Sequence, residues 1–393
     1  MSWLHLVLVA IALAPVGCRD EGRSAVRSTA GPKGERVVPV QPPPWMRERI
    51  GPPRILVVSS YHREYLWSED TNRGLCAGLI ELGYLSGHDE AARLTRDDAL
   101  ETDRVVLRKL WMDTKRKSSE EEIAEAAATV LAVVGEFDPH LVLLGDDNAA
   151  NYVGNQLLDS DVPVVFWGIN GIPLKYGLLD SLDAPGHNVT GVYQAGYLVE
   201  CLEFLKRIVP AIRTFGILSD DSETGRAKVS ELHQLASRGD LPVELVGTVV
   251  TNCAARWKAE ALELAGRADA FFVLNHNTLT DEGGLPVDQL ELGAWYLRNV
   301  RRPDCGHEKQ FAQEGLLATC DDSGFNQALD AARIADRILR ERVDPARIPV
   351  RAPRRGPYIA NRERASMLGL ELQDGMGIEE YVDRCLALER HPD

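Results

Sequence analysis

The chain has 393 residues, which is more than one typical domain needs and enough for two. Hydrophobic residues make up 45% of it, a share that supports buried cores and excludes a largely disordered chain. Lysine and arginine total 44 against 59 aspartates and glutamates, which gives a formal net charge of −15. Nucleic acid is therefore not an expected partner, because binding to phosphates requires a basic surface.

Residues 1–17 have the composition of a signal peptide. The segment 3–16 is mostly apolar, too short for a comfortable membrane span, and is followed by a glycine and Cys18. A small residue before a cysteine is typical of bacterial lipoproteins, so we expect lipidation of Cys18. No lysine or arginine precedes the apolar run, and Pro15 stands where a leucine is usual. A soluble secreted protein and an uncleaved anchor are therefore the alternatives.

Residues 18–53 are predicted to form a lipid-anchored, flexible tether. The segment is rich in glycine, proline, arginine and serine, and three prolines follow one another at 42–44. It shows no apolar periodicity, which favours an extended chain over a packed one.

Six cysteines lie beyond Cys18, at positions 76, 201, 253, 305, 320 and 385. Their wide spacing, without any Cys-x-x-Cys, argues against a zinc site. In an oxidising compartment two of these cysteines could form a disulfide, but the sequence does not show which ones would pair. For Cys76 and Cys201, buried free thiols in apolar helices are the favoured interpretation.

Strands and helices are predicted to alternate from residue 55 onward, which is typical of parallel sheets with helical crossovers. The first half has predicted strands at 55–58, 91–96 (weak), 141–144 and 162–167, and helices at 69–82 and from a capping box at 119–122 to residue 136. The runs 141–144 and 162–167 end abruptly in polar and glycine residues, as strands buried on both faces do.

The same alternation restarts near Tyr193. Predicted strands lie at 214–218, 243–250, 270–274 and 316–319, and helices at 197–209, 225–238, 254–265, 286–299 and 325–340. The segment 301–313 reads RRPDCGHEKQFAQ, which is too polar for a buried strand, so none is expected there.

Four motifs in order carry a family resemblance. They are SSYHREYLW (59–67), GDDNA with PVVFWGIN (145–149 and 163–170), GLL with NVTGV (177–179 and 188–192), and ANRERASMLGLEL (360–372). Together they resemble substrate-binding proteins of ABC transporters, of the tryptophan and tyrosine type, including relatives fused to sensor kinases. The resemblance spans residues 54 to 372.

This resemblance implies an α/β fold of two Rossmann-like lobes with parallel sheets, joined by a hinge that the chain crosses three times (the type 1 periplasmic-binding fold). We place the crossings near Gly191, Thr319 and Asp344. The N-terminal lobe then comprises residues 54–190 plus 320–343, and the C-terminal lobe residues 191–319 plus 344–393. In this fold, the loops after the strands face the cleft between the lobes.

The candidate ligand-binding residues follow from that placement. They are Ser60, Tyr61, His62, Asp146, Asp147, Asn148 and Asn170 in the first lobe, Tyr193, Asp220 and Asn275 in the second, and Asp321 at the hinge. Tyr61, Trp67 and Tyr193 could supply an aromatic wall for such a pocket, although Trp67 lies beyond its loop and the lobe core is the alternative place for it.

Asp146 and Asp147 are the central pair. One is expected to cap the helix that starts near Ala149, and the other, with Asp147 preferred, to contact the ligand. The resemblance suggests an amino-acid ligand. Carboxylates for an ammonium group are plentiful, but no arginine sits in a predicted strand-end loop, which favours a cationic or neutral amine-bearing compound.

The predicted function is that of a solute-binding lipoprotein that delivers a small molecule to an ABC importer. The alternative is an extracytoplasmic sensor of the same fold that signals to a separate membrane kinase or cyclase. The sequence contains no nucleophile elbow, zinc-protease motif or P-loop. We therefore expect no catalytic residues, no bound metal and no cofactor.

Overall fold

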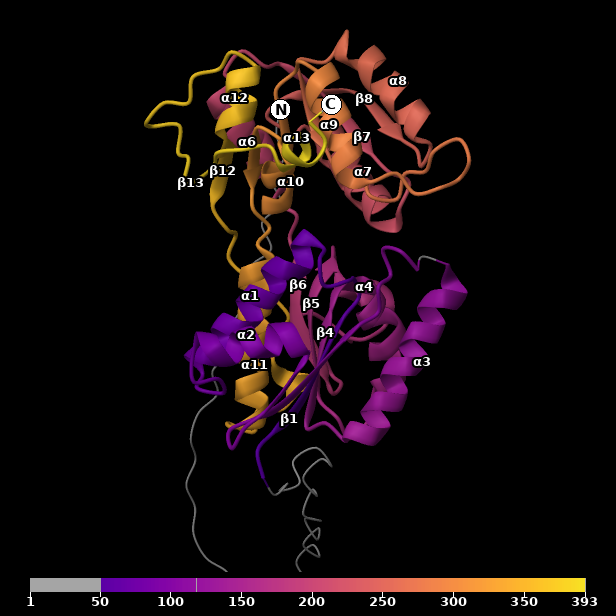
Figure 1. Cartoon of the computed structure of the whole chain (residues 1–393), viewed down its shortest axis with the longest axis vertical. Coiled ribbons are helices and arrows are strands. Elements are labelled where there is room, and N and C mark those ends of the chain that lie inside the picture. Colours follow the sequence, from indigo (N-terminus) through magenta and orange to yellow (C-terminus); the bar gives the residue numbers. More distant parts are fainter. Residues whose placement is uncertain (1–50, 118, 393) are drawn as a thin grey trace, which may run out of the picture. The chain divides into compact units, whose positions relative to one another are not determined.

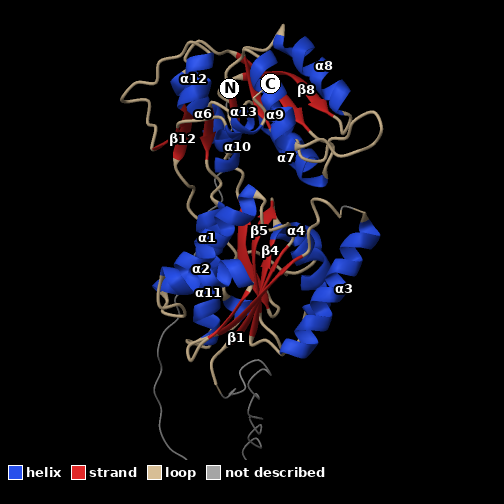
Figure 2. Cartoon of the chain, viewed as in Figure 1, coloured by secondary structure: helices blue, strands red, loops and turns tan. Residues whose placement is uncertain are grey.

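The computed structural model describes residues 51–117 and 119–392, so the predicted signal peptide, Cys18 and nearly all of the tether lie outside the described residues. The described part is an α/β fold with two sheets, each of which is parallel apart from one antiparallel pairing (Figures 1 and 2). This confirms the predicted fold class. Within the described residues, no helix has the length and apolar run that a membrane crossing requires.

The first sheet has six strands in the order β2-β3-β1-β4-β5-β6. Their bounds are β1 Arg54–Ser59, β2 Ala99–Glu101, β3 Val106–Trp111, β4 Leu141–Gly145, β5 Val164–Asn170 and β6 Val189–Gln194. One face is covered by α1 (Leu66–Glu81), α2 (His88–Asp97) and α11 (Gly324–Leu339), and the other by α3 (Glu120–Phe137) (Figure 1). Strands β1, β4 and β5 are buried on both faces, as their unbroken apolar runs predict.

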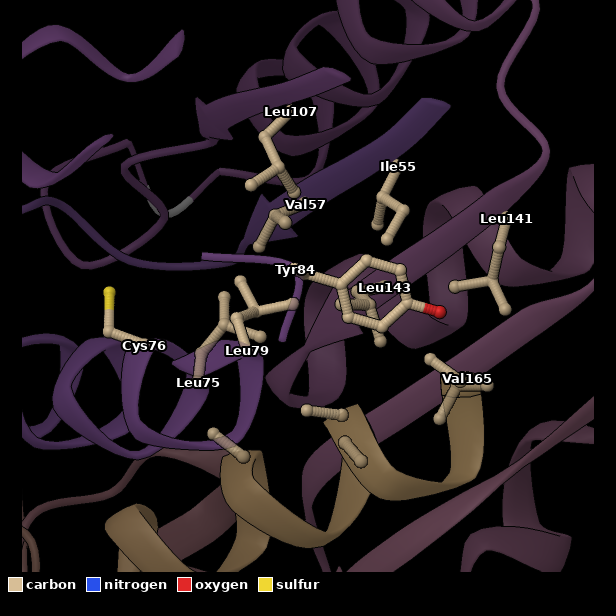
Figure 3. Packing of buried hydrophobic residues seen from close by; sticks show 14 of the residues in the cluster. Ile55, Val57, Leu75, Cys76, Leu79, Tyr84, Leu107, Leu141, Leu143 and Val165 are labelled. Carbon is tan, nitrogen blue, oxygen red and sulfur yellow. The ribbon is translucent and has the colours of Figure 1, made fainter. Parts of the chain in front are cut away.

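The core beneath α1 shows how this sheet is fixed. Leu75 and Leu79 of α1 point toward Val57 of β1, and Tyr84 and Leu143 belong to the same buried cluster (Figure 3). Each of these side chains is at most 2% exposed. Burial of such side chains is worth about 1.5–3 kcal/mol each, so this cluster holds the strand ends in place.

The second sheet has seven strands in the order β13-β12-β11-β10-β9-β7-β8. Their bounds are β7 Thr214–Ser219, β8 Glu244–Val250, β9 Ala270–Val273, β10 Asp304–Gly306, β11 Ala318–Cys320, β12 Tyr358–Asn361 and β13 Glu380–Val382. The helices around it are α6 Leu198–Ile208, α7 Glu223–Arg238, α8 Ala254–Ala265, α9 Gln289–Asn299, α10 Lys309–Glu314, α12 Arg362–Met367 and α13 Leu386–Arg390. Helices α6 and α12 pack on one face, and α8, α9 and α13 on the other (Figure 1).

Two sequence-based element predictions are wrong. The segment 91–96 is part of helix α2, because Ala91 and Leu94 are three residues apart and share one buried face. The polar segment 301–313 does contain a buried strand, β10. Its Asp304 is fully buried because Arg364 of α12 donates to it from Nε at 3.0 Å and from Nη2 at 2.6 Å.

The chain passes between the sheets three times, and the first of these crossings lies later than predicted. Strand β6 belongs to the first sheet as a whole, so the first crossing follows Gln194 rather than Gly191. Thr190 donates from Oγ1 to the carbonyl of Ile348, and Ile348 and Val350 are buried in the cores of the first sheet. We therefore propose that the first lobe extends to Arg351, beyond the predicted limit at residue 343.

The six cysteines of the described residues are all free thiols. Cys76 and Cys201 are buried, as the sequence predicted, and only Cys253 among the six is exposed. Cys201 packs in the core beneath α6, where its thiol donates to the carbonyl of Cys320.

Candidate functional site

A narrow pocket with a cavity volume of about 20 Å³ lies at the carboxyl ends of the strands of the first sheet. Loops, helices and strand ends around both sheets contribute to its lining. The lining residues are Tyr61, Tyr65, Trp67, Lys115, Asp146, Asn170, Gln194, Thr224, Asn275 and Glu308. Four of the predicted site residues, Tyr61, Asp146, Asn170 and Asn275, are thus brought together. The carboxyl ends of parallel strands are where open α/β sheets bind ligands.

Asp146 is the first residue after β4 and has a left-handed backbone, with φ of 71°. Its Oδ1 accepts a hydrogen bond of 2.7 Å from the indole Nε1 of Trp67, and the side chain is almost wholly buried. Burial raises the pKa of Asp146 well above its ordinary value. The hydrogen bond from Trp67 lowers this pKa, but by less than burial raises it. Trp67 is buried as expected for a core residue, yet it also lines the pocket.

The helix that follows β4 is capped by neither aspartate, so that part of the prediction is wrong. Ser60, in the loop after β1, accepts from the backbone N of Ala149 at 2.8 Å and donates to the carbonyl of Gly145 at 2.7 Å. The helix runs from Asp146 to Leu157 and contains a π-helical turn over Ala149–Gly154. Such turns occur often at functional sites.

Asp147, the preferred ligand contact in the sequence-based hypothesis, is bonded within the protein. Its Oδ2 accepts from Nδ2 of Asn170 at 2.7 Å, and its Oδ1 accepts from the hydroxyl of Tyr176 at 2.8 Å. Lys175 Nζ lies 3.2 Å from the same Oδ1. These partners occupy both oxygens, which makes Asp147 a positioning group and leaves Asp146 as the stronger candidate for ligand contact.

Three amide oxygens on the pocket lining have no hydrogen-bond partner among the described residues: Asn170 Oδ1, Gln194 Oε1 and Asn275 Oδ1. Asn170 and Gln194 end the adjacent strands β5 and β6 and are paired in register. A buried acceptor without a partner costs free energy, so these oxygens favour a ligand that brings N–H or O–H donors.

Lys115 is the cation that the sequence analysis missed. Its Nζ lies 4.5 Å from the ring centroid of Tyr61 and 5.2 Å from that of Tyr65, and these two rings meet edge to face. Burial lowers the pKa of Lys115 from its ordinary value. The pocket therefore holds one cation for an anionic ligand group, contrary to the expectation drawn from the absence of arginine.

Contacts between residues of the two sheets surround the pocket. The hydroxyl of Tyr65 accepts from Nδ2 of Asn277 at 2.9 Å, and Glu308 accepts from Nε2 of Gln194 at 3.3 Å. Burial raises the pKa of Glu308, but His307 and Lys228 outweigh it, and the pKa falls below its ordinary value. Glu308 follows β10, the strand that sequence did not predict, so no signal pointed to it.

Two candidates of the first lobe lie outside the lining. Nδ1 of His62 lies 3.3 Å from Oδ1 of Asp113, and burial, reinforced by Arg116, lowers the pKa of His62. Asn148 donates from Nδ2 to Oγ1 of Thr114 at 2.9 Å.

Three further candidates have structural partners instead. Asp220 accepts from the backbone N of Asn277 and of Thr278, both at 3.1 Å. Asp321 accepts from the backbone N of Lys309 at 2.7 Å. Tyr193 packs against the core of the first sheet. None of the three is among the residues that line the pocket.

Within the described residues, no group of histidine, cysteine, aspartate and glutamate side chains is arranged to hold a metal ion. A family model described as ABC transporter substrate binding protein matches residues 108–380, well over half of the chain. The chain belongs to this family. The match includes most of β3, all strands from β4 to β12, and seven of the ten residues that line the pocket. The three lining residues outside it are Tyr61, Tyr65 and Trp67.

A tyrosine-binding protein of Clostridioides difficile is 22% identical over 212 residues, which is 54% of this chain and 58% of that protein. The match thus spans little more than half the length of this curated relative.

Solved structures agree on the fold. A domain of an ABC protein from Streptococcus pneumonia in complex with L-Trp has a TM-score of 0.62, at 18% identity, with 84% of this chain and 100% of that chain covered. A conserved domain protein of Vibrio cholerae has a TM-score of 0.64, with 18% identity and 84% and 99% coverage. The ligand-free, open form of an adhesive substrate-binding protein from Clostridium difficile has a TM-score of 0.59 with the same identity and coverage.

Proposed function

We propose that this substrate-binding protein captures a small amine-bearing molecule, such as an amino acid, in the pocket at the strand ends and delivers it to an ABC importer. The observation that carries the proposal is the lining itself. The lining presents the Asp146 carboxylate and three amide oxygens that have no hydrogen-bond partner among the described residues, and it also presents the positively charged side chain of Lys115. An ammonium group suits the first set and a carboxylate suits the second.

The ligand-binding relatives support the same class of ligand. One relative is named for tyrosine and one solved structure contains L-Trp. The aromatic side chains of Tyr61, Tyr65 and Trp67 provide an apolar wall for such a compound. No enzymatic role is proposed, because the family is a class of binding proteins.

Attachment to a membrane through acylated Cys18 is part of the proposal, although Cys18 lies outside the described residues. Fatty-acid labelling of the intact protein and of Cys18→Ser tests it. Label in the parent and none in the variant is expected, and equal labelling of both would exclude the lipoprotein.

The alternative partner is a separate membrane kinase or cyclase, to which a ligand-bound form would signal. The loop Ser59 to Trp67, which resembles the first-strand loop of relatives fused to sensor kinases, favours this alternative. Co-purification from solubilised membranes distinguishes a permease from a kinase as the partner.

The experiment that tests the ligand class is mass spectrometry of small molecules released from natively purified protein, followed by calorimetric titration with the compound found. Recovery of an amine-bearing compound that rebinds is expected. A released compound without an amine, rebound with the same stoichiometry, would contradict the proposal.

A further inference from the structure

Two acceptor oxygens of the pocket have an orientation that is set by neighbouring carboxylates. An asparagine or glutamine side chain can turn either its oxygen or its NH₂ group toward a ligand. Which of the two a ligand meets therefore depends on what the other end of the amide contacts. For Asn170 and Gln194, that other contact is a carboxylate in each case.

Asp147 and Glu308 decide the orientation. Nδ2 of Asn170 donates to Oδ2 of Asp147 at 2.7 Å, and Nε2 of Gln194 donates to Oε1 of Glu308 at 3.3 Å. A carboxylate accepts hydrogen bonds and offers none, so each amide must turn its NH₂ group toward the carboxylate and its oxygen away. Both oxygens are buried without a partner among the described residues.

These oxygens are grouped with the carboxylate of Asp146. Asp146 follows β4, whereas Asn170 and Gln194 end β5 and β6, so the three acceptors come from three neighbouring strands. Oδ1 of Asp146 is taken by Trp67, which leaves Oδ2 for the ligand. All three residues line the same pocket.

We infer that this edge of the pocket selects a primary ammonium group and rejects its N-methylated derivatives, with Asp147 and Glu308 as the residues that position the selecting oxygens. A primary ammonium has three N–H donors, one for each of Asp146, Asn170 and Gln194. The inference rests on the proposed function, namely that an amine binds here.

The aromatic residues of the pocket make this inference open to a clear test. Tyr61, Tyr65 and Trp67 would by themselves suit a quaternary ammonium, which binds aromatic faces without hydrogen bonds. Methylation of the ligand removes donors but keeps the positive charge and adds apolar surface. If fixed acceptors bind the ammonium group, methylation should weaken ligand binding. If an aromatic cage binds it, methylation should leave the affinity unchanged or raise it.

The test uses calorimetric titration of the intact protein with the nineteen amino acids that carry a primary amine and with their decarboxylated amines. Each compound that binds is then titrated as its N,N-dimethyl derivative. Loss of two donors should weaken binding about 100-fold, since a hydrogen bond to a charged group contributes roughly tenfold. Equal or tighter binding of the dimethyl compound overturns the inference and leaves the proposed function intact. Binding by none of the primary amines overturns both.

The positioning role has its own test in Asp147→Asn and Glu308→Gln. An amide at either position offers a donor as well as an acceptor, so Asn170 or Gln194 is free to turn. The ratio of primary to dimethyl affinity should fall about tenfold in each variant. Asp183→Asn, which alters an exposed carboxylate paired with Arg351, is the matched control and should keep the parent ratio. A general loss of folded protein lowers the affinities for the primary and the dimethyl compound together, so it leaves their ratio unchanged. An unchanged ratio in Asp147→Asn and Glu308→Gln would therefore overturn the positioning role of these two residues.

Discussion

Trp67 donates its indole N–H to Oδ1 of Asp146 at 2.7 Å, in a setting where both side chains are almost completely buried. Trp67 stands at the start of α1 and Asp146 at the start of the helix after β4, so the bond joins the beginnings of two helices, with 79 residues between the two positions. It also compensates part of the cost of burying a carboxylate. The site is therefore held by the same core residue that packs the lobe.

The first prediction compares the two neighbouring aspartates. Asp146→Asn should weaken binding of the amine ligand about tenfold to a hundredfold, because a charge-assisted bond is lost. Asp147→Asn should lower the melting temperature of the ligand-free protein more than Asp146→Asn does, since Asp147 bonds Asn170 and Tyr176. Titration calorimetry and thermal unfolding of both variants check this. Unchanged affinity in Asp146→Asn would remove Asp146 from the site.

The second prediction concerns Gly168, which has φ of 74° in the irregular part of β5. A Cβ at this position would lie 2.3 Å from Oδ1 of Asp146, where the bond from Trp67 is made. Gly168→Ala should therefore destabilise the protein and weaken ligand binding together. The left-handed backbone alone costs about 1–2 kcal/mol for a residue with a Cβ.

Gly171→Ala is the matched control, because Gly171 has φ of 68° and nothing within 4 Å of its Cβ position. It carries the backbone cost without the collision. Denaturant unfolding and ligand titration of both variants separate the two effects. If the two variants lose the same affinity, the close approach of Gly168 to Asp146 does not matter for binding.

The third prediction tests the buried pair under the second sheet. Arg364→Met leaves Asp304 as an uncompensated charge at 0% exposure and should cost about 3–5 kcal/mol of unfolding free energy. Arg362→Met, two residues earlier, breaks an exposed pair with Asp383 and should change stability little. Urea unfolding measures both. A small loss in Arg364→Met would show that this buried pair contributes little to the stability of the fold.

These examples show what the sequence could predict and what it could not. The strands β4 and β5 were predictable because their apolar runs are continuous, and α3 because Ser119 and Glu122 form the capping box that their spacing indicates. Strand β3 was missed because Arg108 and Lys109 interrupt its apolar pattern, and Lys115 in the loop beyond it was missed with it.

In the candidate site, the sequence could predict only those residues that directly follow a recognisable strand. Tyr61, Asp146, Asn170 and Asn275 follow predicted strands and do line the pocket. Glu308 follows a strand whose buried Asp304 depends on Arg364, 60 residues away, and sequence spacing gives no sign of such a pairing. Which aspartate is free was equally hidden, because it depends on the cap provided by Ser60 from another loop.

The last prediction concerns Asp322, which connects two of the segments that pass between the sheets. Its Oδ2 accepts from the backbone N of Gly196 at 2.7 Å, and its Oδ1 from Nε2 of Gln327 at 3.2 Å. Burial raises the pKa of Asp322 to about 7, against the opposing charge of Lys228.

In the unfolded chain, the carboxyl of Asp322 returns to an ordinary pKa of 3.8. The folded state thus holds this proton more tightly, and the resulting stabilisation is complete below about pH 4 and is lost as the pH rises to about 7. Asp322→Asn has no proton to lose at this position. Its melting temperature should therefore fall less between pH 5 and pH 7.5 than that of the parent protein, in calorimetry at constant ionic strength. Asp221→Asn, which alters an exposed carboxylate paired with Arg226, is the control and should keep the parent slope. Equal slopes for Asp322→Asn and the parent would mean that the carboxyl of Asp322 is already ionised throughout this range.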